Sequence, residues 1–223
     1  MHQPHIGMKL PYQAIIFDLE GTIIDTEPLW DEVDAEFVSR RGFTYDPAVS
    51  KHLLMGGTVE GAVKHHQDLH GFGGDVAELA EERRQIFAKL LEREVQFIPG
   101  FTTFHQAVAG THKTAIATSM THRFLTPTEA KLHLSKFFGD HIYSIEEIGF
   151  IPKPNPDIFL HAAAKLHVDP TRCLVVEDAP NGVAAAKAAG MQVVALTTST
   201  TAERLSQADF VVDSYAEILP RIS

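Results

Sequence analysis

Four short stretches of this chain place reactive polar side chains at the end of an apolar run or in a proline-bounded loop. They hold two carboxylates two positions apart, two adjacent hydroxyls, one amine and an adjacent acidic pair: Asp18 and Glu20, Thr118 and Ser119, Lys153, Glu177 and Asp178. Three stretches directly follow the apolar runs AIIF, KTAIA and CLVV, and the fourth is the loop IPKPNPD. This combination of groups suits phosphoryl transfer through an aspartate that also binds a metal ion.

That chemistry has a direct electrostatic basis. Mg²⁺ prefers oxygen ligands, and the carboxylates of Asp18 and Asp178 can supply two of them. The cation and Lys153 would neutralise the charge of a phosphate, so that Asp18 is not repelled when it attacks. The hydroxyl of Thr118, with backbone N–H groups at the following helix start, could donate hydrogen bonds to the phosphate oxygens. We therefore expect Mg²⁺ as cofactor and a small phosphorylated metabolite as substrate.

The elements that must position these groups follow an alternating pattern. Short β-rich runs at 14–17, 113–118, 173–177, 192–196 and 209–212 are separated by segments of helical period. Such alternation predicts an α/β fold, a Rossmann-like doubly wound parallel sheet with helices on both faces. Ligands of these sheets bind beyond the carboxyl ends of the strands, where the polar residues occur.

Residues 28–95 break this alternation, because they contain three helical stretches separated by glycines and no convincing strand. We predict a small helical cap domain at 28–95, inserted into an α/β catalytic core of 1–27 and 96–223. A cap inserted just after the first strand is a candidate lid over the strand ends. Gly56 and Gly57 are expected in a cap loop that approaches the active site, although an ordinary turn between helices fits equally well.

The motifs FDLEGT, ATS, KPNPD and EDAPNG, in that order, resemble the four motifs of the haloacid dehalogenase-like superfamily. The resemblance covers essentially the whole chain and is nearest to the helical-cap branch of sugar phosphatases, nucleotide phosphatases and β-phosphoglucomutase. It implies Asp18 as the nucleophile that forms an aspartyl-phosphate. It further implies that Thr118, with Ser119 as the alternative, and Lys153 bind the phosphate.

The same resemblance implies a metal site. Asp178 would bind Mg²⁺ together with Asp18 and the backbone carbonyl of Glu20, and Glu177 would either bind the metal or support it. Related phosphatases usually have aspartate, not glutamate, at the position of Glu20, where it protonates the leaving group and activates water. One added methylene moves the carboxyl by about 1 Å, and a misplacement of that size can cost about a hundredfold in rate. The resemblance thus implies a phosphatase whose turnover rises in Glu20→Asp.

Each of these residues also has a purely structural alternative. Asp18 and Thr118 could serve local turns, and Lys153 could be an exposed loop lysine. The acidic pair Glu177 and Asp178 could cap the next helix. Among enzymes, the alternative to a phosphatase is a β-phosphoglucomutase-like phosphotransferase. The remaining alternative is a weakly active or inactive pseudo-phosphatase, and its only support is Glu20 in the motif FDLEGT.

Composition narrows the classes of partner. The chain has 19 Lys and Arg against 29 Asp and Glu, a formal charge of −10, which argues against nucleic-acid binding. It has no apolar stretch long enough to span a membrane and no secretion signal at its first residues. With Cys173 as its only cysteine, we expect a cytoplasmic protein, with a monomer favoured. We interpret His65, His66 and His70 as a solvated polar face, and Phe101, Phe104 and Val108 as a core stripe.

Overall fold

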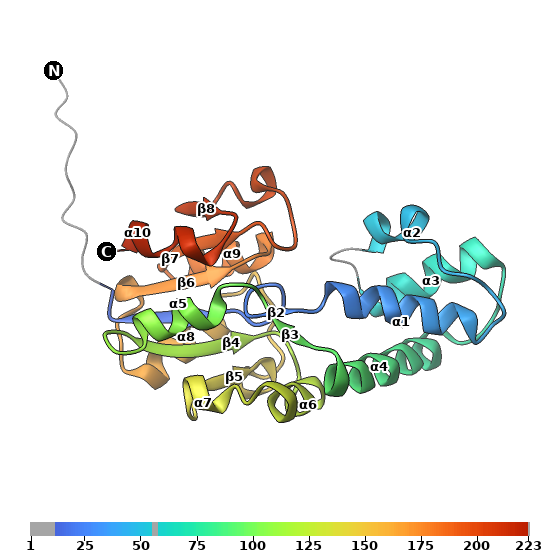
Figure 1. The fold of residues 1–223 in the computed structure, drawn as a ribbon, viewed down its shortest axis with the longest axis horizontal. Helices are drawn as coiled ribbons and strands as arrows, with labels where there is room; N and C mark the ends of the chain where they lie inside the picture. Colours follow the sequence, from blue (N-terminus) through green and yellow to red (C-terminus); the bar gives the residue numbers. More distant parts are fainter. Residues whose placement is uncertain (1–11, 55–57, 223) are drawn as a thin grey trace, which may run out of the picture. The chain divides into compact units, whose positions relative to one another are not determined.

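A parallel β-sheet carries three of the four polar stretches at the ends of its strands (Figure 1). The structure is a computed structural model and describes residues 12–54 and 58–222. Six strands lie in the order β5-β4-β1-β6-β7-β8, and every neighbouring pair is parallel. Their bounds are β1 Ala14–Phe17, β4 Lys113–Thr118, β5 Ile142–Ser144, β6 Cys173–Glu177, β7 Gln192–Leu196 and β8 Phe210–Val212.

The predicted α/β fold with a parallel sheet is confirmed, and four strands occupy the residues expected from the sequence. All residues of β1 and β6 are buried, as the unbroken apolar runs require of central strands with both faces covered. β8 begins at Phe210, one residue later than expected. β5 was not predicted, because its three residues are too few to show a period.

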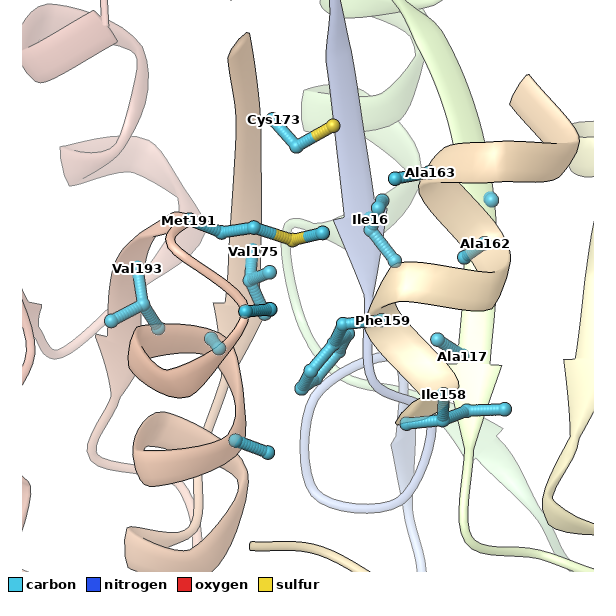
Figure 2. Close-up of a cluster of buried hydrophobic side chains, with 14 of the residues drawn as sticks. Ile16, Ala117, Ile158, Phe159, Ala162, Ala163, Cys173, Val175, Met191 and Val193 are labelled. Atoms are coloured by element: carbon cyan, nitrogen blue, oxygen red, sulfur yellow. The ribbon is translucent and has the colours of Figure 1, made fainter. Parts of the chain in front are cut away.

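Helices α8 (Asp157–Leu166) and α9 (Pro180–Ala188) pack on one face of the sheet. Figure 2 shows Phe159 of α8 among Ile16 of β1 and Val175 of β6, and all three are fully buried. Ala162, Ala163 and Leu166 continue this apolar face along the helix. The helix periodicity read from the sequence therefore matches the buried face.

The opposite face is covered by α5 (Phe101–Val108) and α7 (Ser135–Phe138). The ring of Phe17 meets those of Phe101, Phe104 and Phe138 edge-on, with centroid distances of 5.9, 6.0 and 5.7 Å. Such aromatic pairs contribute about 0.5–1.5 kcal/mol each beyond the area they bury. The predicted core stripe of α5 is confirmed.

A second compact unit comprises Ile24–Gln96 and His122–His133. Its helices are α1 Glu27–Ser39, α2 Pro47–Leu54, α3 Val59–His70, α4 Val76–Arg93 and α6 His122–Leu132. This division differs from the predicted boundaries at α6, which the sequence assigned to the α/β core. The difference arises because Phe124 packs edge-on against Phe87 of α4 at 5.3 Å. Arg123 also forms an ion pair with Glu81 of α4 at 2.7 Å.

The interpretation of the cap histidines as a solvated face is wrong for His66. Its side chain is fully buried, and its Nε2 lies 2.8 Å from Oδ1 of Asp34 on α1. Arg83 of α4 donates to the same oxygen and is also buried. Since Asp34 is 32 positions away in sequence, the helical period of α3 alone could not reveal this partner.

The remaining elements are short segments between the main ones. They are β2 Ile24–Asp25, β3 Gln96–Phe97, α10 Leu219–Ile222 and the 3₁₀ turns η1 Ile145–Ile148, η2 Pro170–Arg172, η3 Ala202–Leu205 and η4 Tyr215–Glu217. β2 and β3 pair as a separate two-stranded sheet. No helix in the described part of the chain is both long enough and apolar enough to cross a bilayer.

Candidate active site

The neighbouring strands β1 and β6 bring two of the predicted acids to one level of the sheet. Their register pairs Phe17 with Val176, so Asp18 and Glu177 follow at matching positions where the two strands end. The N–H of Asp18 donates to the carbonyl of Val176 at 3.0 Å, which extends the pairing to Asp18. Parallel pairing therefore explains why residues so distant in sequence share one edge of the sheet.

Lys153 joins these two acids. Its Nζ lies 2.5 Å from Oδ1 of Asp18 and 2.8 Å from Oε1 of Glu177. The three side chains are 8, 10 and 2% exposed in the order Lys153, Asp18 and Glu177, so the ion pairs are largely shielded from water. The ammonium also lies 4.7 Å from the ring centroid of Phe159, a cation–π contact. The alternative of an exposed loop lysine is therefore wrong.

Asp178 lies beside this pair and has its own partners. The hydroxyl of Thr22 donates to its Oδ1 at 3.0 Å, and the hydroxyl oxygen of Ser199 lies on the same side of Gly21 as its Oδ2. Gly21 makes this approach possible, because a β-carbon there would lie 2.1 Å from Oδ2 of Asp178. The φ of Gly21 is +75°, a backbone conformation that glycine adopts without strain.

Asp18, Glu177 and Asp178 form a group of carboxylates in which one oxygen from each residue lies within 4.8 Å of the others. It is the one such group of three potential metal ligands found among the residues that the structure describes. All three residues are buried, with a single ammonium to balance them. Oxygen donors with excess negative charge in a desolvated site fit a hard divalent cation.

The same charge imbalance perturbs the acids. Burial, reinforced by the charge of Glu177, raises the pKa of Asp18 to about 7, even though Lys153 opposes the shift. Burial and the charges of Glu177 and Asp18 raise the pKa of Asp178 well above its usual range. Burial lowers the pKa of Lys153, but the charges of Asp18 and Glu177 outweigh it and raise that pKa above its usual range. A second cation would relieve the repulsion among the carboxylates.

Both oxygens of Glu177 are already engaged. Oε1 accepts from Lys153, while Oε2 accepts the N–H groups of Asp178 at 2.8 Å and Ala179 at 2.7 Å. Gly182, one turn into α9, leaves room for this carboxylate, because a β-carbon there would lie 1.5 Å from Oε1. Glu177 thus contacts both Lys153 and the backbone that precedes α9. The capping alternative is wrong, because the N-terminus of α9 has no side-chain cap.

The other predicted site residues are placed as follows. Thr118 is buried at the end of β4, and its hydroxyl oxygen accepts the N–H of Met120 at 2.9 Å, while Ser119 is exposed. Glu20 is partly exposed on the turn between Asp18 and Gly21. Gly56 and Gly57 lie outside the described residues.

Sequence reasoning missed Gly182 and Ser199. The only signal for Ser199 was the hydroxyl-rich run TTST, which follows the predicted strand at 192–196 and therefore lies at the same edge of the sheet. Gly182 lay within the quoted motif EDAPNG, but its close approach to a side chain five positions earlier has no pattern in sequence.

Comparison with known proteins identifies the family. Residues 12–190 match the family model of the haloacid dehalogenase-like hydrolases. Fructose-1-phosphate phosphatase YqaB of Escherichia coli K12 is 30% identical over 184 residues, which cover 82% of this chain and 95% of that protein. Hexitol phosphatase B of the same strain is 29% identical, and the match covers 95% of this chain and 97% of that protein.

A solved structure shows the same fold. The HAD family hydrolase of Deinococcus radiodurans R1, crystallised with phosphate and sodium, superposes with a TM-score of 0.80 at 28% identity. The match covers 95% of this chain and 96% of that one. With the profile matching most of the chain, this protein belongs to the haloacid dehalogenase-like hydrolase family.

Proposed function

We propose that this protein is a Mg²⁺-dependent phosphatase that hydrolyses a small phosphorylated metabolite through an aspartyl-phosphate on Asp18. The observation that carries the proposal is the buried contact of Lys153 with both Asp18 and Glu177, beside the carboxylate of Asp178. A lysine that pairs with a strand-end aspartate can also form an ion pair with a phosphate that enters the site.

Asp18 and Asp178 are the proposed Mg²⁺ ligands, with the carbonyl of Glu20 as a third. Glu177 is proposed to support the site through Lys153, because both of its oxygens already accept hydrogen bonds. When bound, the ion supplies positive charge to the transferring phosphoryl group. Thr118, with Ser119 as the alternative, is proposed to donate a hydrogen bond to the phosphate.

The protein groups would act in two steps. In the first, a carboxylate oxygen of Asp18 attacks phosphorus, the bond to the ester oxygen breaks, and Glu20 protonates the departing alkoxide. In the second, the Glu20 carboxylate takes a proton from water, the water oxygen attacks phosphorus, and the bond to Asp18 breaks to release inorganic phosphate. Closure of a helical cap over 28–95 would exclude bulk water during the first step.

The substrate class proposed is a monophosphorylated sugar or sugar alcohol. Support comes from the names of two relatives, a fructose-1-phosphate phosphatase and a hexitol phosphatase. We further propose that the protein acts as a monomer in the cytoplasm, on the ground of its single cysteine and acidic composition.

The test is an assay of the full chain with p-nitrophenyl phosphate and a panel of hexose, pentose and hexitol monophosphates. Phosphate release is expected with Mg²⁺ and should be lost after EDTA treatment. Asp18→Asn should abolish turnover and also the covalent-like labelling by beryllofluoride, followed by fluorine NMR. Asp140→Asn, which changes an exposed acid of the same unit, is the matched control and should retain both.

Two outcomes would contradict the proposal. Substrate binding without turnover, in the wild type and in Glu20→Asp alike, would identify a pseudo-phosphatase. Regeneration of phosphoenzyme by a sugar bisphosphate, with isomerised sugar phosphate as product, would identify a phosphotransferase.

A further inference from the structure

The loop that follows β7 reaches the proposed metal site, although none of its residues belongs to the four motifs. The hydroxyl of Ser199 lies beside the carboxylate of Asp178, since a β-carbon at Gly21 would be within 2.3 Å of both groups. The neighbouring Thr198 donates through its hydroxyl to the backbone carbonyl of Gly21. Two consecutive residues of one loop therefore contact both the proposed ligand on β6 and the turn that follows β1.

Gly21 allows the three segments to meet closely. A β-carbon at this residue would lie 2.1 Å from Oδ2 of Asp178 and 2.3 Å from the hydroxyl oxygen of Ser199. Both oxygens therefore lie against the same side of the Gly21 α-carbon, at distances that only glycine permits. The loops after β1, β6 and β7 are thus packed in direct contact at the carboxyl edge of the sheet.

The hydroxyl of Thr22 holds the same carboxylate from the β1 side. Thr22 donates to Oδ1 of Asp178 at 3.0 Å. The backbone of Thr22 is fixed in turn by Tyr215, whose hydroxyl donates to its carbonyl at 2.8 Å. Tyr215 is 1% exposed, and such a buried hydroxyl is held firmly by the core around it.

We propose that Ser199 is a positioning residue that fixes the carboxylate of Asp178 for divalent-cation binding, an inference that rests on the proposed metal site. A carboxylate has about four lone-pair positions. Thr22 donates to one of them, and a hydrogen bond from the adjacent Ser199 hydroxyl would occupy a second and leave the others in fixed directions. Without Ser199, the carboxylate of Asp178 can turn about its terminal torsion and must lose that freedom when the cation binds. Partners of this kind around a ligand typically contribute about 10- to 100-fold to metal affinity.

The test compares Mg²⁺ binding by isothermal titration calorimetry in the wild type, Ser199→Ala and Ser199→Thr. In Ser199→Ala the Kd for Mg²⁺ should rise about tenfold or more. Ser199→Thr keeps the hydroxyl and should restore binding. Thr200→Ala, which changes the next residue of the loop, should bind as the wild type does.

Activity against Mg²⁺ concentration separates positioning from a general structural role. In Ser199→Ala the Mg²⁺ concentration for half-maximal rate should rise with the Kd, while turnover at saturating Mg²⁺ stays close to the wild-type value. Lower turnover at every Mg²⁺ concentration with an unchanged Kd would overturn the proposal.

A second variant guards against misfolding of Ser199→Ala. Ser199→Cys preserves the side-chain size but supplies only a weak donor, so its Kd should lie between those of the alanine variant and the wild type. A Kd equal to the wild-type value in both variants would overturn the role of Ser199 alone. If the wild type itself binds no Mg²⁺, the proposed metal site fails with it.

Discussion

Gly182→Ala changes a residue that contacts no substrate and should still disable the site. Gly182 lies in helix α9, where glycine to alanine ordinarily stabilises by about 1 kcal/mol. Here the added methyl carbon would lie 1.5 Å from Oε1 and 1.9 Å from Cδ of Glu177. These distances are far inside van der Waals contact, so the carboxylate of Glu177 or the helix must move.

The magnitude follows from the bonds that Glu177 would lose. Its carboxylate accepts from Lys153 at 2.8 Å and from two backbone N–H groups at 2.8 and 2.7 Å. Hydrogen bonds to charged groups contribute about 1.5–3 kcal/mol each, so the loss of two costs about 3–6 kcal/mol. After subtraction of the gain in helix propensity, of about 1 kcal/mol, we expect a destabilisation of about 2–5 kcal/mol.

Activity should fall as well, because Glu177 is one of two acids that hold Lys153. A displacement of Lys153 by about 1 Å would lower the rate of phosphate release by about a hundredfold. Stability is best followed by far-UV circular dichroism during urea denaturation. Trp30, the only tryptophan, lies in the helical unit and would not report the change.

Gly110→Ala is the matched control, since a β-carbon there meets nothing within 4 Å. It should leave activity unchanged and stability the same or slightly higher. If Gly182→Ala proved as stable as the wild type or about 1 kcal/mol more stable, with normal activity, then the placement of Glu177 against α9 would be wrong.

Three further predictions concern other parts of the molecule. Glu20→Asp should raise phosphatase turnover, measured as phosphate release at saturating substrate, and an unchanged or lower rate would contradict the acid/base role of Glu20. Asp34→Ala removes the carboxylate partner of buried Arg83 and the hydrogen-bond partner of buried His66, and it should destabilise the helical unit by about 3–5 kcal/mol, followed by Trp30 fluorescence in urea; a change below 1 kcal/mol would contradict it. Burial lowers the pKa of His105 below its ordinary 6.5, so the unfolded chain binds the proton more readily. Stability should therefore fall as pH drops through about 6.5, and it should fall less in His105→Gln; equal pH slopes of the unfolding free energy would refute this.

The central strands could be predicted from sequence because burial on both faces imposes a continuous apolar run, as in β1 and β6. Helix α6 could not, because Pro127 interrupts its helical pattern. Its membership of the helical unit depends on Phe124 meeting Phe87, a contact between segments that the chain order separates. The sequence thus predicts the individual helices and strands better than it predicts which of them pack together.

The same limit applies to polar partners. Asp18 and Asp178 could be assigned to one edge of the sheet, since each directly follows a strand and parallel strands end together. Lys153 lies in the loop between η1 and α8, so its place at this edge rested on the motif KPNPD. The burial of His66 could not be anticipated, because its helix is polar and the compensating Asp34 belongs to another helix. A buried polar pair between two helices produces no repeating pattern in the sequence of either helix, so the sequence alone cannot reveal it.

The adjacent acids Glu177 and Asp178 differ in their hydrogen-bond partners, although one oxygen of each lies within 4.8 Å of the other. Glu177 accepts from Lys153 and from the backbone N–H groups that precede α9, whereas Asp178 accepts from the hydroxyl of Thr22 and lies beside that of Ser199. The sequence EDAPNG shows two carboxylates and therefore suggests two metal ligands. The hydrogen bonds distinguish them, since Glu177 has both oxygens engaged by charged or backbone donors. Asp178 keeps lone pairs that are oriented by neutral hydroxyls, which is the condition under which a carboxylate can still bind a cation.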